Sequence, residues 1–396
     1  MNKRKKIIFI FLGVLITGGV VYWFFFLPKP LVPPDKDRRP PVVTPETAPT
    51  TGETGEKPPT GEEGLGEAIP AEEEILASGE RLVKLTDYPV IAPSLNKDEN
   101  KVVFYKKEGG DLWSSDFTGK KKTKESSITI INLMEAVWSP DKSRAAVFYL
   151  DKETKKGFIH IGASSVSILP QDIKSFSWSP DGKSAAYLIA RDKNTDLIIT
   201  DNLGKNPRTV LSTPMRDIQL SWITSDKIAL QSPPSGLAEG HLLVFSLSSR
   251  SLNRLASGLF GLMTLWAPDG SKFLSTVTDS FGKNLEFFVK DSSGKEIFAS
   301  AFPTIPDKCF WASSIETYCA LAVDFPTEAI MPDNYLSGEI NTKDQIVFLN
   351  TSQKQVYSVL PDPQFDISNL LSTKKQDYLF FVNRTDGTLW SLKIEY

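Results

Sequence analysis

The chain contains very little cysteine and histidine. Its 396 residues include two Cys, Cys309 and Cys319, and two His, His160 and His241. Two cysteines exclude a disulfide-rich scaffold and any Cys-based metal cluster. Two histidines leave little room for a His-held zinc site. Both histidines lie in short strand-like runs, so we expect them to have structural roles.

The linear motifs of common enzyme chemistry are also missing. The sequence has no Gly-x-Ser-x-Gly elbow, no glycine-rich phosphate loop, and no His, Asp and Glu residues at metal-ligand spacing. We therefore expect no catalytic residue, no metal and no cofactor, and we predict that the protein is not an enzyme. Residues 81–396 are neutral overall, which gives no electrostatic reason to expect nucleic-acid binding.

One uncharged run, residues 7–27, is long enough to cross the ~30 Å hydrocarbon core of a membrane as a helix. The basic residues in segment 1–6 predict a short cytoplasmic tail before it. A cleaved signal peptide is the alternative, but the apolar run is too long and no small-residue cleavage site follows. The sequence therefore predicts a single-pass anchor in the inner (cytoplasmic) membrane, with the rest of the chain extracytoplasmic.

Residues 28–80 have a different composition from the rest of the chain. They hold eleven of the 27 prolines, ten glutamates and only scattered apolar residues. Such a segment buries too little apolar surface to offset its chain entropy. We expect a disordered Pro/Glu-rich linker that holds a folded domain, residues 81–396, away from the membrane.

A turn unit recurs along residues 81–396. It is clearest at residues 178–182, Trp-Ser-Pro-Asp-Gly, where Pro presets one turn dihedral, Asp hydrogen-bonds the backbone and Gly takes a positive φ. A short apolar run precedes each turn and a strand-like run follows it. The units begin at intervals of 40, 44, 44 and 45 residues, at Trp138, Trp178, Trp222, Trp266 and Trp311. Regular spacing of this size predicts β-propeller blades.

Two weaker units, beginning near Ile91 and Ile367, bring the count to seven. Six or eight blades would require one weak unit to be miscounted. The strand-like run Arg81–Thr86 has no hairpin partner, and the seventh unit lacks a fourth strand. Placing Arg81–Thr86 as the outer strand of the last blade closes the ring and removes an unpaired edge. The prediction is an all-β, seven-bladed propeller closed by its N-terminal strand.

The repeated unit at Trp138, Trp178 and Trp266 resembles the repeat of TolB-like, WD-repeat-like propellers. It is also similar to the repeat in the propeller domains of dipeptidyl-peptidase-type enzymes. The resemblance covers residues 81–396 and is degraded at Trp222 and Trp311. It implies a seven- or six-bladed propeller engaged in protein–protein contact outside the cytoplasm.

The repeated aromatic and acidic residues have a structural interpretation. One large aromatic per repeat fills the wedge between neighbouring blades, and an Asp inside each turn caps the backbone rather than joining a ligand ring. The acids concerned are Asp141, Asp181, Asp226 and Asp269. Cys309 and Cys319 flank a turn on neighbouring antiparallel strands, so a disulfide and two buried thiols both remain open.

Two insertions depart from the repeat. Gln231–Gly240 and Asp324–Asp344 separate the second and third strands of the fourth and sixth units. Long loops on a rigid scaffold usually carry recognition, and the predicted partner face comprises Pro233, Pro234, Leu237, Phe260, Phe325, Met331, Tyr335 and Leu336. The alternative is that the loops fold onto the propeller as a lid over the central channel.

The combined expectation is a non-catalytic protein-interaction or scaffolding module in the cell envelope. Its partner would be a protein or a cell-wall component. The alternative is a small-ligand or carbohydrate-binding sensor, or an enzyme, that uses the central channel.

Overall fold

A computed structural model describes residues 81–323 and 326–394. The predicted tail, membrane segment and linker (residues 1–6, 7–27 and 28–80) and Phe325 lie outside these residues. Within them, no helix is both long enough and apolar enough to pass through a membrane.

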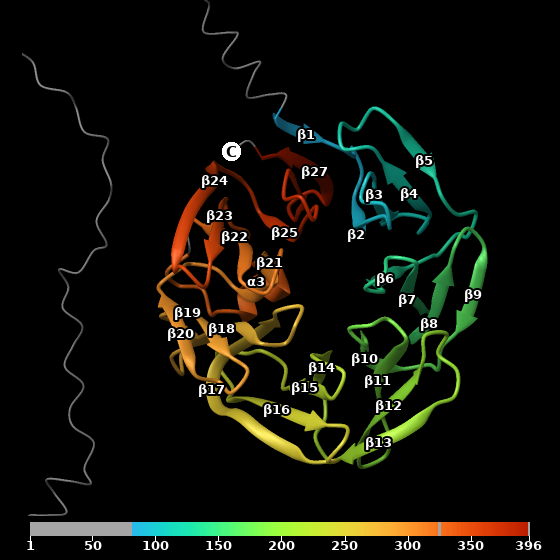
Figure 1. Ribbon diagram of the computed structural model, residues 1–396, viewed down its shortest axis with the longest axis vertical. Coiled ribbons are helices and arrows are strands. Elements are labelled where there is room, and N and C mark those ends of the chain that lie inside the picture. The colour runs from blue at the N-terminus through green and yellow to red at the C-terminus, as the bar shows by residue number, and fades with distance from the viewer. Residues whose placement is uncertain (1–80, 324–325, 395–396) are drawn as a thin grey trace, which may run out of the picture. The chain divides into compact units, whose positions relative to one another are not determined.

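Antiparallel sheets follow one another around a ring, and their strands occupy four positions from the centre outward (Figure 1). The innermost strands are β2(Val90–Leu95), β6(Leu133–Trp138), β10(Ile173–Trp178), β14(Gln219–Trp222), the second half of β17(Leu252–Trp266), β21(Cys309–Trp311) and β25(Ile367–Ser372). The second strands are β3(Val102–Lys106), β7(Arg144–Asp151), β11(Ser184–Ala190), β15(Lys227–Gln231), β18(Lys272–Thr278), β22(Glu316–Ala322) and β26(Tyr378–Asn383).

The third strands are β4(Leu112–Ser115), β8(Thr154–Ile161), β12(Thr195–Asp201), β16(Gly240–Ser246), β19(Glu286–Asp291), β23(Asp344–Asn350) and β27(Thr388–Lys393). The outer strands are β5(Lys122–Lys124), β9(Ser165–Ile168), β13(Arg208–Thr213), the first half of β17, β20(Glu296–Ser300), β24(Gln355–Phe365) and β1(Leu82–Lys84). Two short helices, η1(Pro306–Lys308) and α3(Asp333–Ser337), lie in the sixth repeat.

The turn unit forms the hairpin that its residues predict. Between β10 and β11 the Asp181 carboxylate accepts hydrogen bonds from the Ser179 hydroxyl at 2.6 Å and the Lys183 amide at 3.1 Å. Gly182 takes a φ of +67°, a conformation that costs glycine little because it has no Cβ. The predicted capping role of the repeated acids is therefore confirmed at Asp181, and Asp269 caps the corresponding turn through Ser271.

Strand β17 belongs to two groups of strands. Its first half pairs with β16 and its second half pairs with β18, so seven strands form one hydrogen-bonded sheet. The other described sheets have four strands each.

The N-terminal strand closes the ring. Strand β1 pairs with β27, with Leu82 opposite Leu392 and Lys84 opposite Trp390, and the sheet order is β1-β27-β26-β25. The predicted exchange of an N-terminal strand into the last sheet is therefore confirmed. The main-chain groups of β27 gain a partner that the chain's own C-terminal repeat does not supply.

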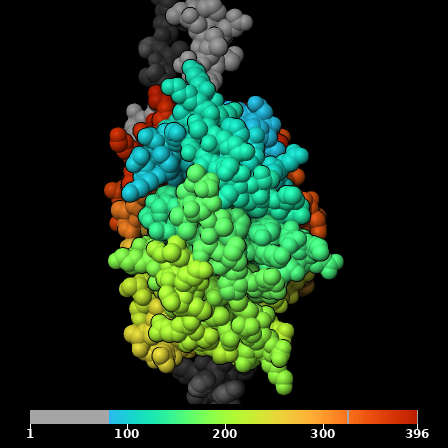
Figure 2. All heavy atoms as spheres, turned by 90° about the vertical axis from the view of Figure 1, so that its right-hand side faces the viewer, coloured from blue at the N-terminus to red at the C-terminus, as the bar shows by residue number. Residues whose placement is uncertain are grey.

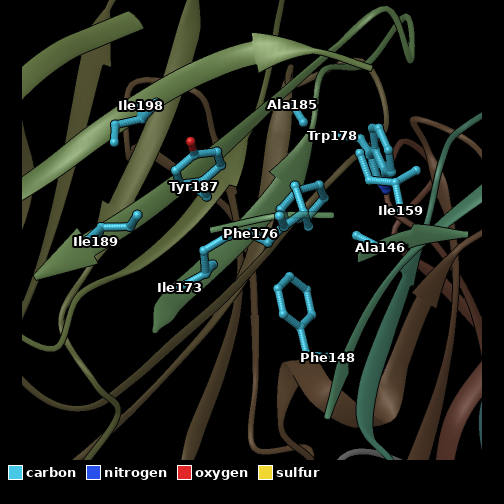
Figure 3. Close-up of a cluster of buried hydrophobic side chains, with 11 residues drawn as sticks. Ala146, Phe148, Ile159, Ile173, Phe176, Trp178, Ala185, Tyr187, Ile189 and Ile198 are labelled. Atoms are coloured by element: carbon cyan, nitrogen blue, oxygen red, sulfur yellow. The ribbon is translucent and has the colours of Figure 1, made fainter. Parts of the chain in front are cut away.

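The core lies between neighbouring sheets. Figure 3 shows one such cluster, in which Phe148 of β7 lies against Phe176 of β10, and Phe176 in turn packs edge-on against Trp178. The Trp178 indole donates a hydrogen bond to the Val137 carbonyl of the preceding inner strand at 2.8 Å. Trp138 and Trp311 make equivalent bonds to Ala92 and Leu265. Figure 2 shows the outer rim, where the first repeats follow one another in chain order.

Cys309 and Cys319 lie directly opposite each other on β21 and β22, as the sequence predicts, and they form a disulfide. The bond is buried among Trp311, Leu321 and Val347. Both cysteines therefore belong to the core between the fifth and sixth repeats.

Acid should destabilise the ring through its turns. Hydrogen bonds from the Ser179 hydroxyl and then the Lys183 amide lower the pKa of Asp181 below 3.8, its ordinary value. A lowered folded-state pKa gives stabilisation that is complete above the unfolded value and is lost as the pH falls through the folded value. Replacing Asp181 by Asn should lower the free energy of unfolding by about 0.5–1 kcal/mol at pH 7 and reduce its fall below pH 4. Urea unfolding at several pH values measures both effects. If the free energy of unfolding of the Asp181→Asn variant were lower than that of the wild-type protein by the same amount at every pH, the role of Asp181 in the pH dependence would be contradicted.

Candidate active site

Two cavities open on the side of the ring that carries the turns between first and second strands. The first, of about 340 Å³, lies between the first and second repeats; it is lined by Asn96, Lys101, Val103, Tyr105, Leu112, Glu125, Trp138, Lys142, Ser143, His160, Gly162 and Ala163. The second, of about 370 Å³, lies beside the inner strands β2, β21 and β25. Trp138 and Lys142 line both cavities. We call the two cavities together the Trp138 groove.

The floor of the groove holds a buried pair of side chains. The Tyr105 hydroxyl, on β3, lies 2.7 Å from Nδ1 of His160, on β8. Both side chains are buried, and Nε2 of His160 has no hydrogen-bond partner within the described residues. Burial raises the pKa of Tyr105 and lowers the pKa of His160. At neutral pH the hydroxyl is therefore protonated and the imidazole is uncharged.

The rim of the groove is charged. Lys101 lies 3.5 Å from the Glu125 carboxylate, which also accepts a hydrogen bond from the Ser114 hydroxyl. Lys142 is exposed at the junction of the two cavities, where the surrounding protein desolvates it and lowers its pKa. In residues 81–323 and 326–394, no carboxylate lies within ion-pair distance of Lys142. The junction thus presents one cation that is free to bind an anionic group.

This arrangement combines three chemical capacities. Nε2 of the neutral His160 imidazole is unpartnered and buried, so it can accept a proton from a ligand that reaches the floor of the groove. The ammonium group of Lys142 can neutralise a carboxylate, and the half-buried indole of Trp138 offers a flat face to a ligand ring. The expectation that His160 is purely structural did not take account of this environment.

The two insertions come together on the opposite side of the ring. The Asp333 carboxylate accepts hydrogen bonds from the Ser235 hydroxyl at 2.8 Å and the Gly236 amide at 2.6 Å. Met331 and Tyr335 are buried with Met263 and Ile305 of the ring. The lid alternative therefore describes the insertions, and we call residues 231–240 and 326–343 the lid.

The predicted partner face is thus divided. Placing Met331 and Tyr335 on an exposed contact surface was wrong, because both apolar side chains pack against the ring; they are 3% and 4% exposed. Pro233, Leu237 and Leu336 are exposed, Pro234 and Phe260 are partly buried, and Phe325 lies outside the described residues. Whether the exposed residues bind a partner stays a prediction.

The Tyr105–His160 pair could not be read from any local motif. The two residues are 55 positions apart, and each occupies an ordinary strand position. The available signal was weak: both side chains belong to the inner part of neighbouring repeats, one on the second strand and one on the third.

Comparison with known proteins supports the fold. No protein-family model matches the chain, and no curated protein matches it. Among solved structures, an oligogalacturonate lyase in complex with manganese has 12% identity and a TM-score of 0.56, covering 81% of this chain and 94% of that one. An oligogalacturonate lyase from Vibrio parahaemolyticus has 10% identity and a TM-score of 0.52, covering 79% and 93%. The β-propeller domain of the Trilobed protease from Pyrococcus furiosus has 10% identity and a TM-score of 0.51, covering 77% and 95%.

The manganese of one matched lyase can be tested against this chain. Within the described residues, no group of three or more His, Cys, Asp or Glu side chains converges on one point. His160 is bonded to Tyr105, and His241 lies 3.0 Å from the Ser257 hydroxyl on the surface. The described side chains therefore do not fit a manganese site of that kind.

The comparisons correct one expectation and confirm another. Two of the matched propellers are lyases, so the prediction of a non-catalytic module that is not an enzyme is contradicted. That prediction rested on missing linear motifs, whereas a propeller assembles its site from residues far apart in the chain. The match to the β-propeller domain of the Trilobed protease and the ring of four-stranded sheets confirm the predicted all-β propeller fold.

Proposed function

We propose that this propeller is an enzyme that acts on an acidic carbohydrate bound in the Trp138 groove. The observation that carries the proposal is the Tyr105–His160 pair, which places an uncharged imidazole on the floor of a cleft. Lys142, at the junction of the two cavities, would hold a carboxylate of the ligand. Two matched propellers of the same fold are named as lyases of oligogalacturonate, a carboxylated sugar chain.

The reaction class that suits these groups is β-elimination. His160 takes the proton from the carbon beside the sugar carboxylate. The electron pair of the broken carbon–hydrogen bond then forms a carbon–carbon double bond. The bond to the neighbouring glycosidic oxygen breaks, and the leaving oxygen receives a proton from the Tyr105 hydroxyl or from water. Lys142 stabilises the negative charge that develops on the carboxylate. A lowered pKa keeps His160 in its basic, proton-accepting form near neutrality.

The test uses the full-length protein and oligogalacturonate as the probe. New ultraviolet absorbance reports the double bond conjugated to the carboxylate. Replacing His160 by Gln should lower kcat on the order of 100-fold, the usual contribution of a general base. Replacing Lys142 by Met should raise KM, because it removes a charge that holds substrate, and should also lower kcat, because the same charge stabilises the developing carboxylate charge.

A matched control separates chemistry from folding. His241→Gln removes the other histidine, which lies on the surface beside Ser257, and should leave turnover unchanged. Far-ultraviolet circular dichroism of each variant checks that the fold is retained. The function would be refuted if the wild-type protein neither bound oligogalacturonate nor formed the double bond. A fully active His160→Gln variant would refute the assigned base.

Two further features of the protein belong to the same proposal. We propose seven blades, because β17 divides between two groups of four strands that each match the other repeats in strand order. We also propose that residues 7–27 anchor the chain in the inner membrane, with residues 1–6 cytoplasmic and residues 28–80 as the spacer. The basic cluster and the uncharged run support this topology.

A further inference from the structure

A third cavity lies under the lid, at the opposite mouth of the channel from the Trp138 groove. Its volume is about 120 Å³, enough for a small organic molecule. It is lined by Gln219, Ser221, Ala229, Gln231, Pro234, Met263, Thr264, Asp307 and Leu336. Inner strands β14 and β17 supply some of these residues, the lid supplies Pro234 and Leu336, and helix η1 supplies Asp307.

Asp307 stands apart from the other acids of the ring. Its neighbour Lys308 is buried and bonded to Asp344 and Asp366, so it offers Asp307 no charge. Across the described chain, no cation or hydrogen-bond donor reaches the Asp307 carboxylate, and desolvation by the cavity walls raises its pKa. The side chain is nevertheless exposed where it lines the cavity. An unpartnered carboxylate in such a position is stabilised by any cation that enters.

The other polar side chains of the cavity divide into occupied and free groups. Gln231 accepts a hydrogen bond from the Thr264 hydroxyl at 2.6 Å and donates one to the Leu262 carbonyl at 3.2 Å, so its amide is fixed. The side chains of Gln219 and Ser221 make no hydrogen bond within residues 81–323 and 326–394. Gln219, Ser221 and Asp307 therefore offer three oxygen acceptors around one small space.

We propose that this cavity is a binding site for a small primary amine, with its ammonium group on the Asp307 carboxylate. An ammonium group has three N–H donors and no acceptor, which suits three oxygens in one cavity. The apolar part of the ligand lies against Pro234 and Leu336. The lid supplies two walls of the cavity, and its Asp333 holds Ser235 and Gly236 in place beside Pro234. The site does not depend on the reaction proposed for the Trp138 groove.

Calorimetric titration of the full-length protein with ethanolamine tests the site. Ethylene glycol is the matched uncharged probe, since it replaces the ammonium group with a hydroxyl. We expect ethanolamine to bind at least tenfold more tightly than ethylene glycol. Replacing Asp307 by Asn should abolish that difference, whereas Asp362→Asn, an exposed acid on β24, should preserve it.

Thermal unfolding without ligand shows whether each variant folds, and Asp307→Asn is expected to melt no lower than the wild-type protein. Equal binding of the two probes would overturn the proposal, and so would unchanged ethanolamine binding by Asp307→Asn. Stabilisation by calcium chloride with no response to ethanolamine would also overturn it, because it would identify a metal site. Loss of lyase activity in His160→Gln has no bearing on these results.

Discussion

Replacing Lys308 by Ala is expected to lower the free energy of unfolding by ~3–5 kcal/mol, the usual loss when one member of a buried ion pair is removed. The Lys308 ammonium is 1% exposed and contacts two carboxylates, Asp344 at 2.5 Å and Asp366 at 2.8 Å. It also donates a hydrogen bond to the Thr342 hydroxyl at 2.8 Å. Without Lys308, the buried Asp344 carboxylate would have no cation, and Asp366 would keep only the Arg384 guanidinium, at 3.5 Å.

The titration behaviour of the two carboxylates supports this expectation. Desolvation raises the pKa of Asp344 even with Lys308 present. Desolvation is also the largest single influence on Asp366, but the charge and hydrogen bond of Lys308 and the hydrogen bonds from Tyr335 and Thr342 together outweigh it and hold the pKa of Asp366 below 3.8. Removing the ammonium leaves Asp344 to the effect of burial and weakens the opposition to burial at Asp366, so the variant is expected to take up protons on folding and to be least stable at alkaline pH.

Urea unfolding at pH 7 measures the loss. Lys308→Met keeps most of the apolar stem and should be nearly as destabilising, because Asp344 remains buried without a cation and Asp366 keeps only Arg384. Lys295→Ala, an exposed lysine on a turn, should change stability by less than about 0.5 kcal/mol. If Lys308→Met loses less than about 1 kcal/mol, the ion network contributes little to stability.

The Lys308 network also connects the lid to the ring. The Tyr335 hydroxyl, on α3, donates a hydrogen bond to Asp366 at 2.9 Å, and the Arg384 guanidinium lies over the Tyr335 ring at 4.2 Å. Lys308 itself lies 4.6 Å from the same ring. The sixth repeat therefore carries both the fixed base of the lid and, in adjacent Asp307, the acid that the lid covers.

The repeat pattern made the ring predictable, whereas the polar sites were not. Each turn unit such as Trp178–Gly182 encodes its hairpin locally, through Pro, Asp and Gly, so comparison of its copies reveals the repeat. The closure by β1 followed from counting strands against the same pattern. These features depend on contacts near in sequence or on a regular period.

The polar sites depend on pairs of residues that are neither close in sequence nor repeated at a regular period. Lys308 meets Asp366 across 58 positions, and Tyr105 meets His160 across 55. Sequence alone shows a charged residue or a tyrosine in a strand, and only packing between sheets decides which are buried together. For the same reason the interpretation of Met331 and Tyr335 was wrong: their residue types suit a contact surface, but they belong to the lid and pack against the ring.

Substitutions of Trp138 and Trp178 are expected to have the second large effect. Comparing the two positions separates an effect on folding from an effect on ligand binding. Both indoles donate a hydrogen bond at 2.8 Å to the preceding inner strand. Trp178 is buried beside Phe148 and Phe176, so replacing it by Ala should lower the free energy of unfolding by about 3–5 kcal/mol. Trp138 is only partly buried, so Trp138→Ala should cost less, about 2–3 kcal/mol.

Substitution at Trp138 should weaken ligand binding more than substitution at Trp178, although substitution at Trp178 costs more stability. Trp138 lines both cavities of the groove, whereas Trp178 lines neither. The milder variants Trp138→Phe and Trp178→Phe both lose the indole hydrogen bond, about 1 kcal/mol each, and retain a folded ring. Titration with oligogalacturonate should then show weaker binding, by at least fivefold, in Trp138→Phe alone. Equal affinities in the two variants would mean that the indole of Trp138 only fills the wedge between blades, as the indole of Trp178 does. A difference would show that one copy of a structural repeat residue also serves the site, because its blade borders the groove.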